Sequence, residues 1–148
     1  MQKLQPHATD LIIRNDLKEL SLLSEAMKRI GAEQKISPKP LVQLQVALDE
    51  VVSNVIRYAW PEGGTHEIHI HIDVHGDEVK IEIVDDGVMF DLRNAPPPAQ
   101  SPPGLARRSG GVGIHMTKQL IDAIAFERID GRNHLTLTKR GAVDIPSQ

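Results

Sequence analysis

Glu50 and Asn54 have residue types and a spacing that could do chemistry. They lie four residues apart in an apolar segment whose periodicity predicts a helix, so they share one face of it. They could simply form a solvated polar edge of that helix. Alternatively, Asn54 offers an amide oxygen to Mg²⁺, which prefers oxygen ligands and substrate phosphates. Glu50 would then orient or deprotonate an attacking hydroxyl or water.

Asp85-Asp86-Gly87 ends a segment in which apolar and polar residues alternate. The alternation predicts a strand with Asp85 on its apolar face, where a carboxylate is costly to bury unless a group donates to it. One interpretation is a strand-end Asp that starts a turn. The other is a carboxylate that accepts a hydrogen bond from the amino group of a ligand, with Gly87 letting the chain pass close to that ligand.

Gly110, Gly111 and Gly113 end a long loop and open an expected helix. Backbone N–H groups at a helix start bind anions such as phosphate, and glycines let the phosphate approach. A plain helix-entry turn would give the same pattern. The segment is neither a Walker loop nor a dinucleotide-binding fingerprint, because it lacks the P-loop sequence and no strand runs directly into it.

Composition limits the function classes. The chain has 17 Lys and Arg residues against 20 Asp and Glu residues, a net charge of −3, which argues against broad binding to nucleic acid. Without cysteine there is no disulfide, thiolate nucleophile or Cys-ligated zinc. No apolar run is long enough to predict a transmembrane helix. The N-terminus lacks an apolar signal core, so the cytoplasm is the expected location.

Three histidines, His69, His71 and His75, recur along one expected strand. Histidine is a common metal ligand, so a metal patch is conceivable. Nothing in the sequence supplies a deep site for a metal. We therefore interpret these residues as the solvated face of a strand.

The elements that must position these groups follow from the apolar periodicity. They are a strand at 10–15, helices at 17–30 and 41–59, a hairpin at 68–75 and 79–85, a helix at 112–124, and a second hairpin at 125–129 and 134–139. Gly31 is expected to stop the first helix, and Ser37 to cap the second with Pro38 just inside it. Five of the eight residues at 96–103 are Pro, which predicts a long loop of functional or disordered character.

This order predicts an α+β fold in one domain, residues 1–148. We expect a two-layer α/β sandwich with a mixed, mainly antiparallel sheet and helices on one face.

Three stretches together resemble a known family: LDEVVSNVIRYAW at 48–60, DDGVMFD at 85–91, and residues 110–139. They resemble the Bergerat-fold ATPases, and within them the anti-sigma-factor serine/threonine kinases of bacteria. The resemblance covers nearly the whole chain. It implies ATP and Mg²⁺ as cofactors. It also implies a sigma factor and an anti-anti-sigma antagonist protein as partners, with a homodimer as a further option and no direct role for nucleic acid or membrane.

The resemblance also implies a role for each candidate residue. Glu50 would be the general base toward a serine or threonine hydroxyl of a partner protein, and Asn54 would hold Mg²⁺. Asp85 would take the amino group of adenine, and Gly87 would let the base sit against the strand. The glycines would line the phosphates: Gly110, Gly111 and Gly113. Residues 92–109 would form the ATP lid.

Met89 departs from the family pattern, because many Bergerat proteins have a second glycine at that place. Thr136 and Thr138 are not assigned to adenine, since alternation puts them on the polar face of their strand. Two other functions stay open. One is a nucleotide-binding module that sequesters its partner without phosphoryl transfer. The other, less favoured, is a detached histidine-kinase catalytic domain, which would need a dimerising helix pair that is not found before residue 10.

Overall fold

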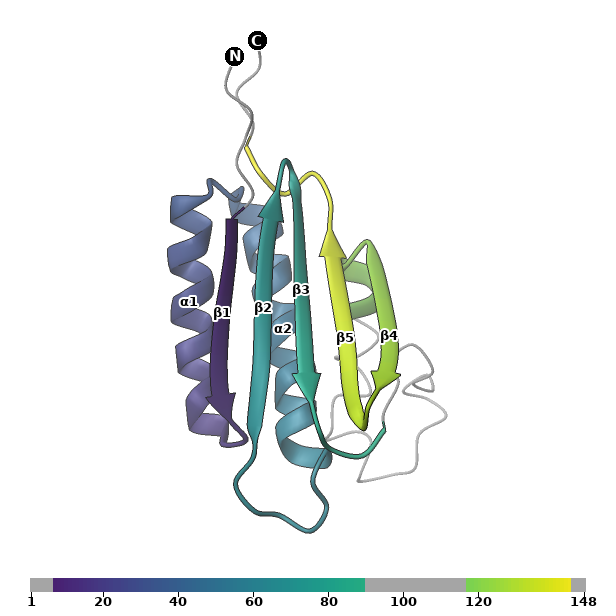
Figure 1. Ribbon diagram of the computed structural model, residues 1–148. Coiled ribbons are helices and arrows are strands. Elements are labelled where there is room, and N and C mark those ends of the chain that lie inside the picture. The colour runs from purple at the N-terminus through teal and green to yellow at the C-terminus, as the bar shows by residue number, and fades with distance from the viewer. Residues whose placement is uncertain (1–6, 90–116, 145–148) are drawn as a thin grey trace.

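A computed structural model describes residues 7–89 and 117–144 of the chain. Within them, five strands form one sheet in the order β1-β2-β3-β5-β4 (Figure 1). The strands are β1 (His7–Arg14), β2 (Glu67–His75), β3 (Glu78–Asp85), β4 (Ala123–Ile129) and β5 (Arg132–Lys139). Every described pairing is antiparallel, where the sequence led us to expect a mixed sheet.

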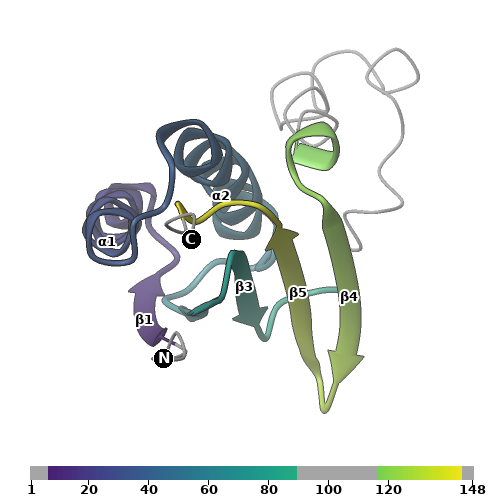
Figure 2. The same cartoon turned by 90° about the horizontal axis from the view of Figure 1, so that it is seen from above.

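Two helices cover one face of this sheet (Figure 2). They are α1 (Leu20–Glu33), which follows a single 3-10 turn, and α2 (Pro38–Tyr58). Ser37 is the N-cap residue of α2 and Pro38 is its first residue, as predicted, although the Ser37 side chain makes no capping hydrogen bond. The predicted α+β fold, a two-layer sandwich with helices on one face, is therefore confirmed.

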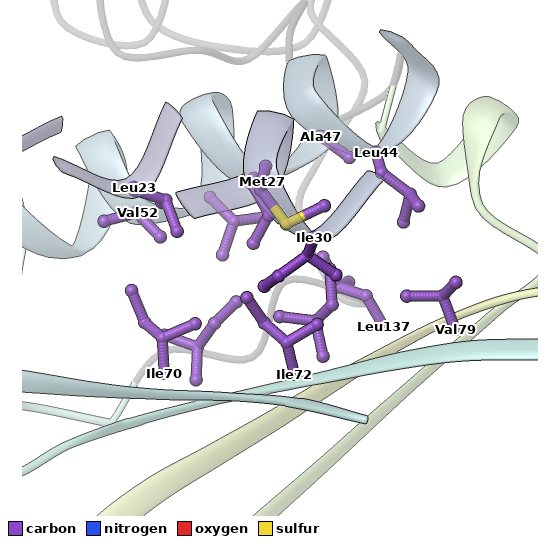
Figure 3. Close-up of a cluster of buried hydrophobic side chains, with 14 of the residues drawn as sticks. Leu23, Met27, Ile30, Leu44, Ala47, Val52, Ile70, Ile72, Val79 and Leu137 are labelled. Atoms are coloured by element: carbon purple, nitrogen blue, oxygen red, sulfur yellow. The ribbon is translucent and has the colours of Figure 1, made fainter. Parts of the chain in front are cut away.

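The core lies between the two helices and the sheet, and its side chains are aliphatic apart from one methionine (Figure 3). Alternate residues of β2 and β3 point into it, as the period of a half-buried strand requires. The labelled members are Leu23, Met27, Ile30, Leu44, Ala47, Val52, Ile70, Ile72, Val79 and Leu137. Aromatic residues make up only 3% of the chain, so interdigitated Leu, Ile and Val side chains fill this space.

The prediction that Gly31 stops the first helix is wrong. Helix α1 continues through Gly31 to Glu33. A Cβ atom on Gly31 would lie 2.8 Å from Cδ2 of Leu41, so this glycine lets α1 and α2 approach each other. The chain reverses instead at Lys35, which has a φ of 57°.

The helix predicted at 112–124 is wrong at its C-terminal end. In the described part, helical structure is confined to 117–120, and β4 begins at Ala123. Residues between this helical segment and β4 are hydrogen-bonded to β5: the Asp122 amide donates to the Thr138 carbonyl at 3.0 Å. The Asp122 carboxylate also accepts from the amide of Arg140 at 2.7 Å. Pairing across the sheet thus overrides a helical period that continues in the sequence.

Candidate functional site

Asp85 is the last residue of β3, and its side chain is only 6% exposed. It continues the buried face of the strand, as the alternation predicted. Two groups within the described residues donate to its Oδ1: the Gly87 amide at 2.9 Å and Nδ2 of Asn133 at 2.9 Å. The first bond is the turn-starting contact of the simpler interpretation. Within the described residues, both of these bonds are therefore made to Oδ1 rather than to Oδ2.

Burial raises the pKa of the Asp85 carboxyl above its usual value of 3.8. The hydrogen bonds from Asn133 and the Gly87 amide act in the opposite direction, as does the charge of Arg128, and the charge of Asp86 adds to the rise. The ionised carboxylate is therefore held in the fold against a desolvation penalty. A buried carboxylate of this kind is typical of a binding site.

The raised pKa of Asp85 predicts how stability depends on pH. In the ligand-free protein, the Asp85 carboxyl loses its proton more easily in the unfolded chain than in the folded one. The free energy of unfolding therefore falls as the pH rises from 3.8 through the higher pKa of the folded state. The variant Asp85→Asn lacks this ionisation, and its amide oxygen can accept the same two hydrogen bonds. Its free energy of unfolding should therefore increase relative to wild type across that window and then level off. Urea unfolding of both proteins at several pH values measures the difference, and a difference independent of pH would contradict the assignment.

Asn133 was missed by the sequence analysis. It is the second residue of β5, lies directly opposite Asp85 on β3 and is 5% exposed. Its Oδ1 accepts from Nη1 of Arg128 at 2.7 Å. The Asp130-Gly131 dipeptide is typical of a hairpin turn and predicts that β4 pairs with β5. No local pattern predicts that β5 also pairs with β3.

Gly87 lies where the turn after β3 crosses the C-terminal end of α2. A Cβ atom there would come within 2.4 Å of both the Cβ and the carbonyl oxygen of Ala59. The next amide, of Val88, donates to that carbonyl at 2.8 Å. The close approach that requires glycine is thus to the end of α2, and it ties this helix to the Asp85 turn.

Replacing Gly87 by Ala should lower the free energy of unfolding by about 1–3 kcal/mol, because a well-packed site must open to admit a methyl group. Combining it with Ala59→Gly should restore part of the loss, since that change removes one of the three Ala59 atoms that would clash. The carbonyl of residue 59 remains, so the rescue stays incomplete. A double-mutant cycle by urea unfolding measures the coupling, and strictly additive effects would contradict the contact.

Glu50 and Asn54 share one face of α2, as the spacing predicted. Nδ2 of Asn54 donates to Oε2 of Glu50 at 3.0 Å and to its carbonyl oxygen at 2.8 Å. Asn54 is only 6% exposed, so these residues are not a solvated polar edge. The amide nitrogen of Asn54 is engaged by Glu50, which leaves the amide oxygen to ligate a cation. Glu50 is half-buried and lines a groove between α1 and α2.

Helix α2 links this pair to Asp85. Asn54 precedes Ala59 by five residues, which corresponds to about 7–8 Å along the helix axis. Glu50 is one further helical turn away. Helix α2 therefore places the Glu50–Asn54 pair at a fixed distance from its C-terminal end, which contacts the turn after Asp85.

Trp60 joins the end of α2 to the turn after β3. Its indole Nε1 donates to Oδ1 of Asp86 at 3.0 Å. Its ring stacks on His66, with ring centroids 4.6 Å apart and planes 2° from parallel. Trp60 therefore packs at the end of α2, and its partner Asp86 adjoins Asp85 in the sequence.

The remaining candidates divide into two groups. The loop glycines and the proposed lid lie outside the described residues, so their assignments stay predictions: Gly110, Gly111, Gly113 and residues 92–109.

His69 and His71 extend outward from β2 beside carboxylates, with His71 Nδ1 2.6 Å from Asp10 Oδ1. No group of three metal-ligating side chains occurs within residues 7–89 and 117–144. His69 and His75 are exposed, as expected for the solvated face of a strand. Among the helices in those ranges, none has the length and apolar character to span a membrane.

Residues 13–139 match the family model of the histidine kinase-like ATPase domain. The chain is 31% identical over 121 residues to the serine/threonine-protein kinase BtrW of Bordetella bronchiseptica, an alignment that covers 78% of this chain and 82% of that protein. It is 28% identical over 106 residues to the serine-protein kinase RsbW of Oceanobacillus iheyensis, covering 69% of this chain and 65% of that protein.

The fold also resembles a crystal structure of the RsbU and RsbW domains of a Mycobacterium tuberculosis protein. The TM-score is 0.62 at 16% sequence identity, and the match covers 89% of this chain and 32% of that chain. The present chain thus spans about a third of that solved chain, and this likeness concerns the fold alone. Matched from β1 to the end of β5, the chain belongs to the histidine kinase-like ATPase domain family, with its Bergerat-type fold, and is a distant homologue of the RsbW and BtrW kinases.

Proposed function

We propose that this protein is an ATP-dependent serine/threonine protein kinase that acts as an anti-sigma regulatory factor. It would bind a sigma factor and phosphorylate an anti-anti-sigma antagonist protein, in the cytoplasm. The observation that carries the proposal is the pairing of Glu50 with Asn54 on a helix whose end contacts the Asp85 turn. The names of the kinases to which the chain is related support the same activity.

The proposed mechanism uses two places along α2. Next to its C-terminal end, the carboxylate of Asp85 on β3 accepts a hydrogen bond from the amino group of adenine. More than two turns earlier, inside the helix, the half-buried Glu50 carboxylate orients the serine or threonine hydroxyl of the antagonist and accepts its proton. Phosphoryl transfer depends mainly on positioning and on charge neutralisation, so few side chains need to act directly.

Asn54 would hold Mg²⁺, which supplies charge neutralisation at the phosphates when bound. The donor set fits this ion, because the Asn54 amide oxygen is a hard ligand whose orientation is fixed by the bonds of Nδ2 to Glu50. We further assign phosphate contacts to Gly110, Gly111 and Gly113, and an ATP lid to residues 92–109, within one domain that spans 1–148.

The test combines binding with transfer. Calorimetry with Mg-ATP should show binding by the wild-type protein. Incubation with γ-labelled ATP and a purified antagonist should then yield phosphoserine or phosphothreonine on the antagonist. Binding without a phosphoprotein, while the partner is retained in the complex, would instead favour a nucleotide-binding module that acts by sequestration. Absence of ATP binding by folded protein would exclude both functions.

A further inference from the structure

The Asn133 side chain is buried and uses both of its polar atoms. Nδ2 donates to Oδ1 of Asp85 at 2.9 Å and to the Val88 carbonyl at 2.9 Å. A longer contact of 3.4 Å reaches the Gly87 carbonyl. Oδ1 accepts from Arg128 at 2.7 Å. Asn133 therefore spans the turn from the Asp85 carboxylate to the Val88 carbonyl, although it comes from a different strand.

Arg128 holds this amide from β4. Its Nη1 donates to Asn133 Oδ1 and, at 3.1 Å, to the Gly87 carbonyl. Its Nη2 donates to the Gly131 carbonyl in the β4–β5 turn at 3.3 Å. One planar guanidinium thus ties the β4–β5 turn to the Asp85 turn, a geometry that a lysine ammonium does not reproduce.

An amide side chain has two ends that differ little in shape but are opposite in hydrogen-bonding character. The Arg128 guanidinium can only donate, so Asn133 must turn its oxygen toward Arg128. The NH₂ group then faces the Asp85 carboxylate, which can only accept when ionised. Arg128 thereby decides which end of Asn133 meets Asp85, and the reverse orientation would place oxygen against oxygen and NH₂ against guanidinium.

We propose that Asn133, oriented by Arg128, is a positioning residue that fixes the Asp85 carboxylate with Oδ2 toward the exocyclic amino group of the base, and so sets the preference for adenine. The torsion that rotates a carboxylate plane is broad and roughly two-fold. Two donors on one oxygen narrow that rotation and leave the other oxygen to select an amino group over a carbonyl. The inference rests on the proposed function, because it assigns a role within the same nucleotide site.

A purely structural role is the alternative, in which the network only fastens the turn. The two roles differ in what they do to base recognition. If the network only holds the turn in place, its loss should weaken the binding of every nucleotide alike. If it positions the carboxylate, its loss should weaken the binding of ATP much more than that of inosine triphosphate, whose base carries a carbonyl in place of the amino group. It should also move the pH dependence of ATP binding, because donation from Asn133 lowers the pKa of Asp85.

The experiment measures the affinities for Mg-ATP and Mg-inosine triphosphate at neutral pH and at a series of lower pH values at which the proteins remain folded. The proteins are wild type, Asn133→Ala and Arg128→Gln. Arg132→Gln is the matched control, since this exposed residue adjoins Asn133 on β5. Loss of one hydrogen bond to a charged group predicts a roughly 10-fold or greater fall in ATP affinity for Asn133→Ala at neutral pH. Inosine triphosphate should change little, and the acid limb of ATP binding should move to higher pH.

Arg128→Gln keeps Asn133 but removes the group that orients it, so the preference for ATP should fall in the same direction and by less. Arg128 is exposed, so this variant decides the matter if Asn133→Ala fails to fold. Equal losses for both nucleotides with an unchanged pH profile would overturn the inference and leave the proposed function in place. Failure of the wild-type protein to bind ATP would overturn the proposed function itself.

Discussion

Replacing Glu50 by Gln should lower the rate of phosphate transfer to the antagonist by about 100-fold or more, the usual contribution of a general base. Affinity for Mg-ATP should stay near that of wild type. The Gln side-chain oxygen can still accept the hydrogen bond that Asn54 donates to Oε2, so the cation-binding amide keeps its orientation. What the variant loses is the group that takes a proton. Single-turnover transfer from labelled ATP, alongside calorimetric binding, separates the two effects.

Asp49→Asn is the matched control for that experiment. Asp49 is the preceding residue of α2, is exposed and lines the same groove. Its substitution removes one carboxylate charge from the groove without touching the Asn54 amide. Transfer should remain within a few-fold of wild type. If Glu50→Gln transferred phosphate as fast as this control, Glu50 would not be the base.

Replacing Asp85 by Asn should weaken ATP binding by about 100-fold or more. The amide oxygen of the variant can keep the bonds from the Gly87 amide and Asn133, so the NH₂ group would occupy the Oδ2 position and meet the adenine amino group donor to donor. A missing charge-assisted hydrogen bond and an unsatisfied donor act in the same direction. Calorimetry with Mg-ATP measures the loss directly.

The same variant should be at least as stable as wild type at neutral pH, since it removes a desolvated charge from the fold. Loss of binding therefore cannot be attributed to unfolding. Asp86→Asn is the control, because Asp86 is the adjacent carboxylate, is exposed and accepts a hydrogen bond from Trp60. Retention of full ATP affinity by Asp85→Asn would remove Asp85 from the base site and leave the buried carboxylate as a turn former.

The sequence predicts the parts of this site that depend on local periodicity. Helical spacing places Glu50 beside Asn54, and strand alternation puts Asp85 on the buried face; both follow from residues close in the chain. Local periodicity does not predict the role of Asn133, because its contact with Asp85 requires β5 to lie beside β3. Along the chain, 47 residues separate the two positions. Strand order is a property of the whole sheet, and it decides which polar side chains meet.

Two local predictions failed for a related reason. Gly31 looks like a helix stop, but its small size serves the contact with Leu41 of α2. The apolar period at 112–124 continues past the helix end, yet hydrogen bonds to β5 take the chain into the sheet at Asp122. In both cases a contact outside the local segment, which helix propensity does not include, accompanies the conformation that the chain adopts.

The stacked ring at the end of α2 also gives this protein a built-in optical probe. Trp60 is the only tryptophan in the sequence, so tryptophan fluorescence arises from a single place. That place is joined by one hydrogen bond to the neighbour of Asp85, and the indole lies flat against His66. Emission colour and quenching therefore report on the turn that holds the proposed base site, in unlabelled protein and on the stopped-flow timescale.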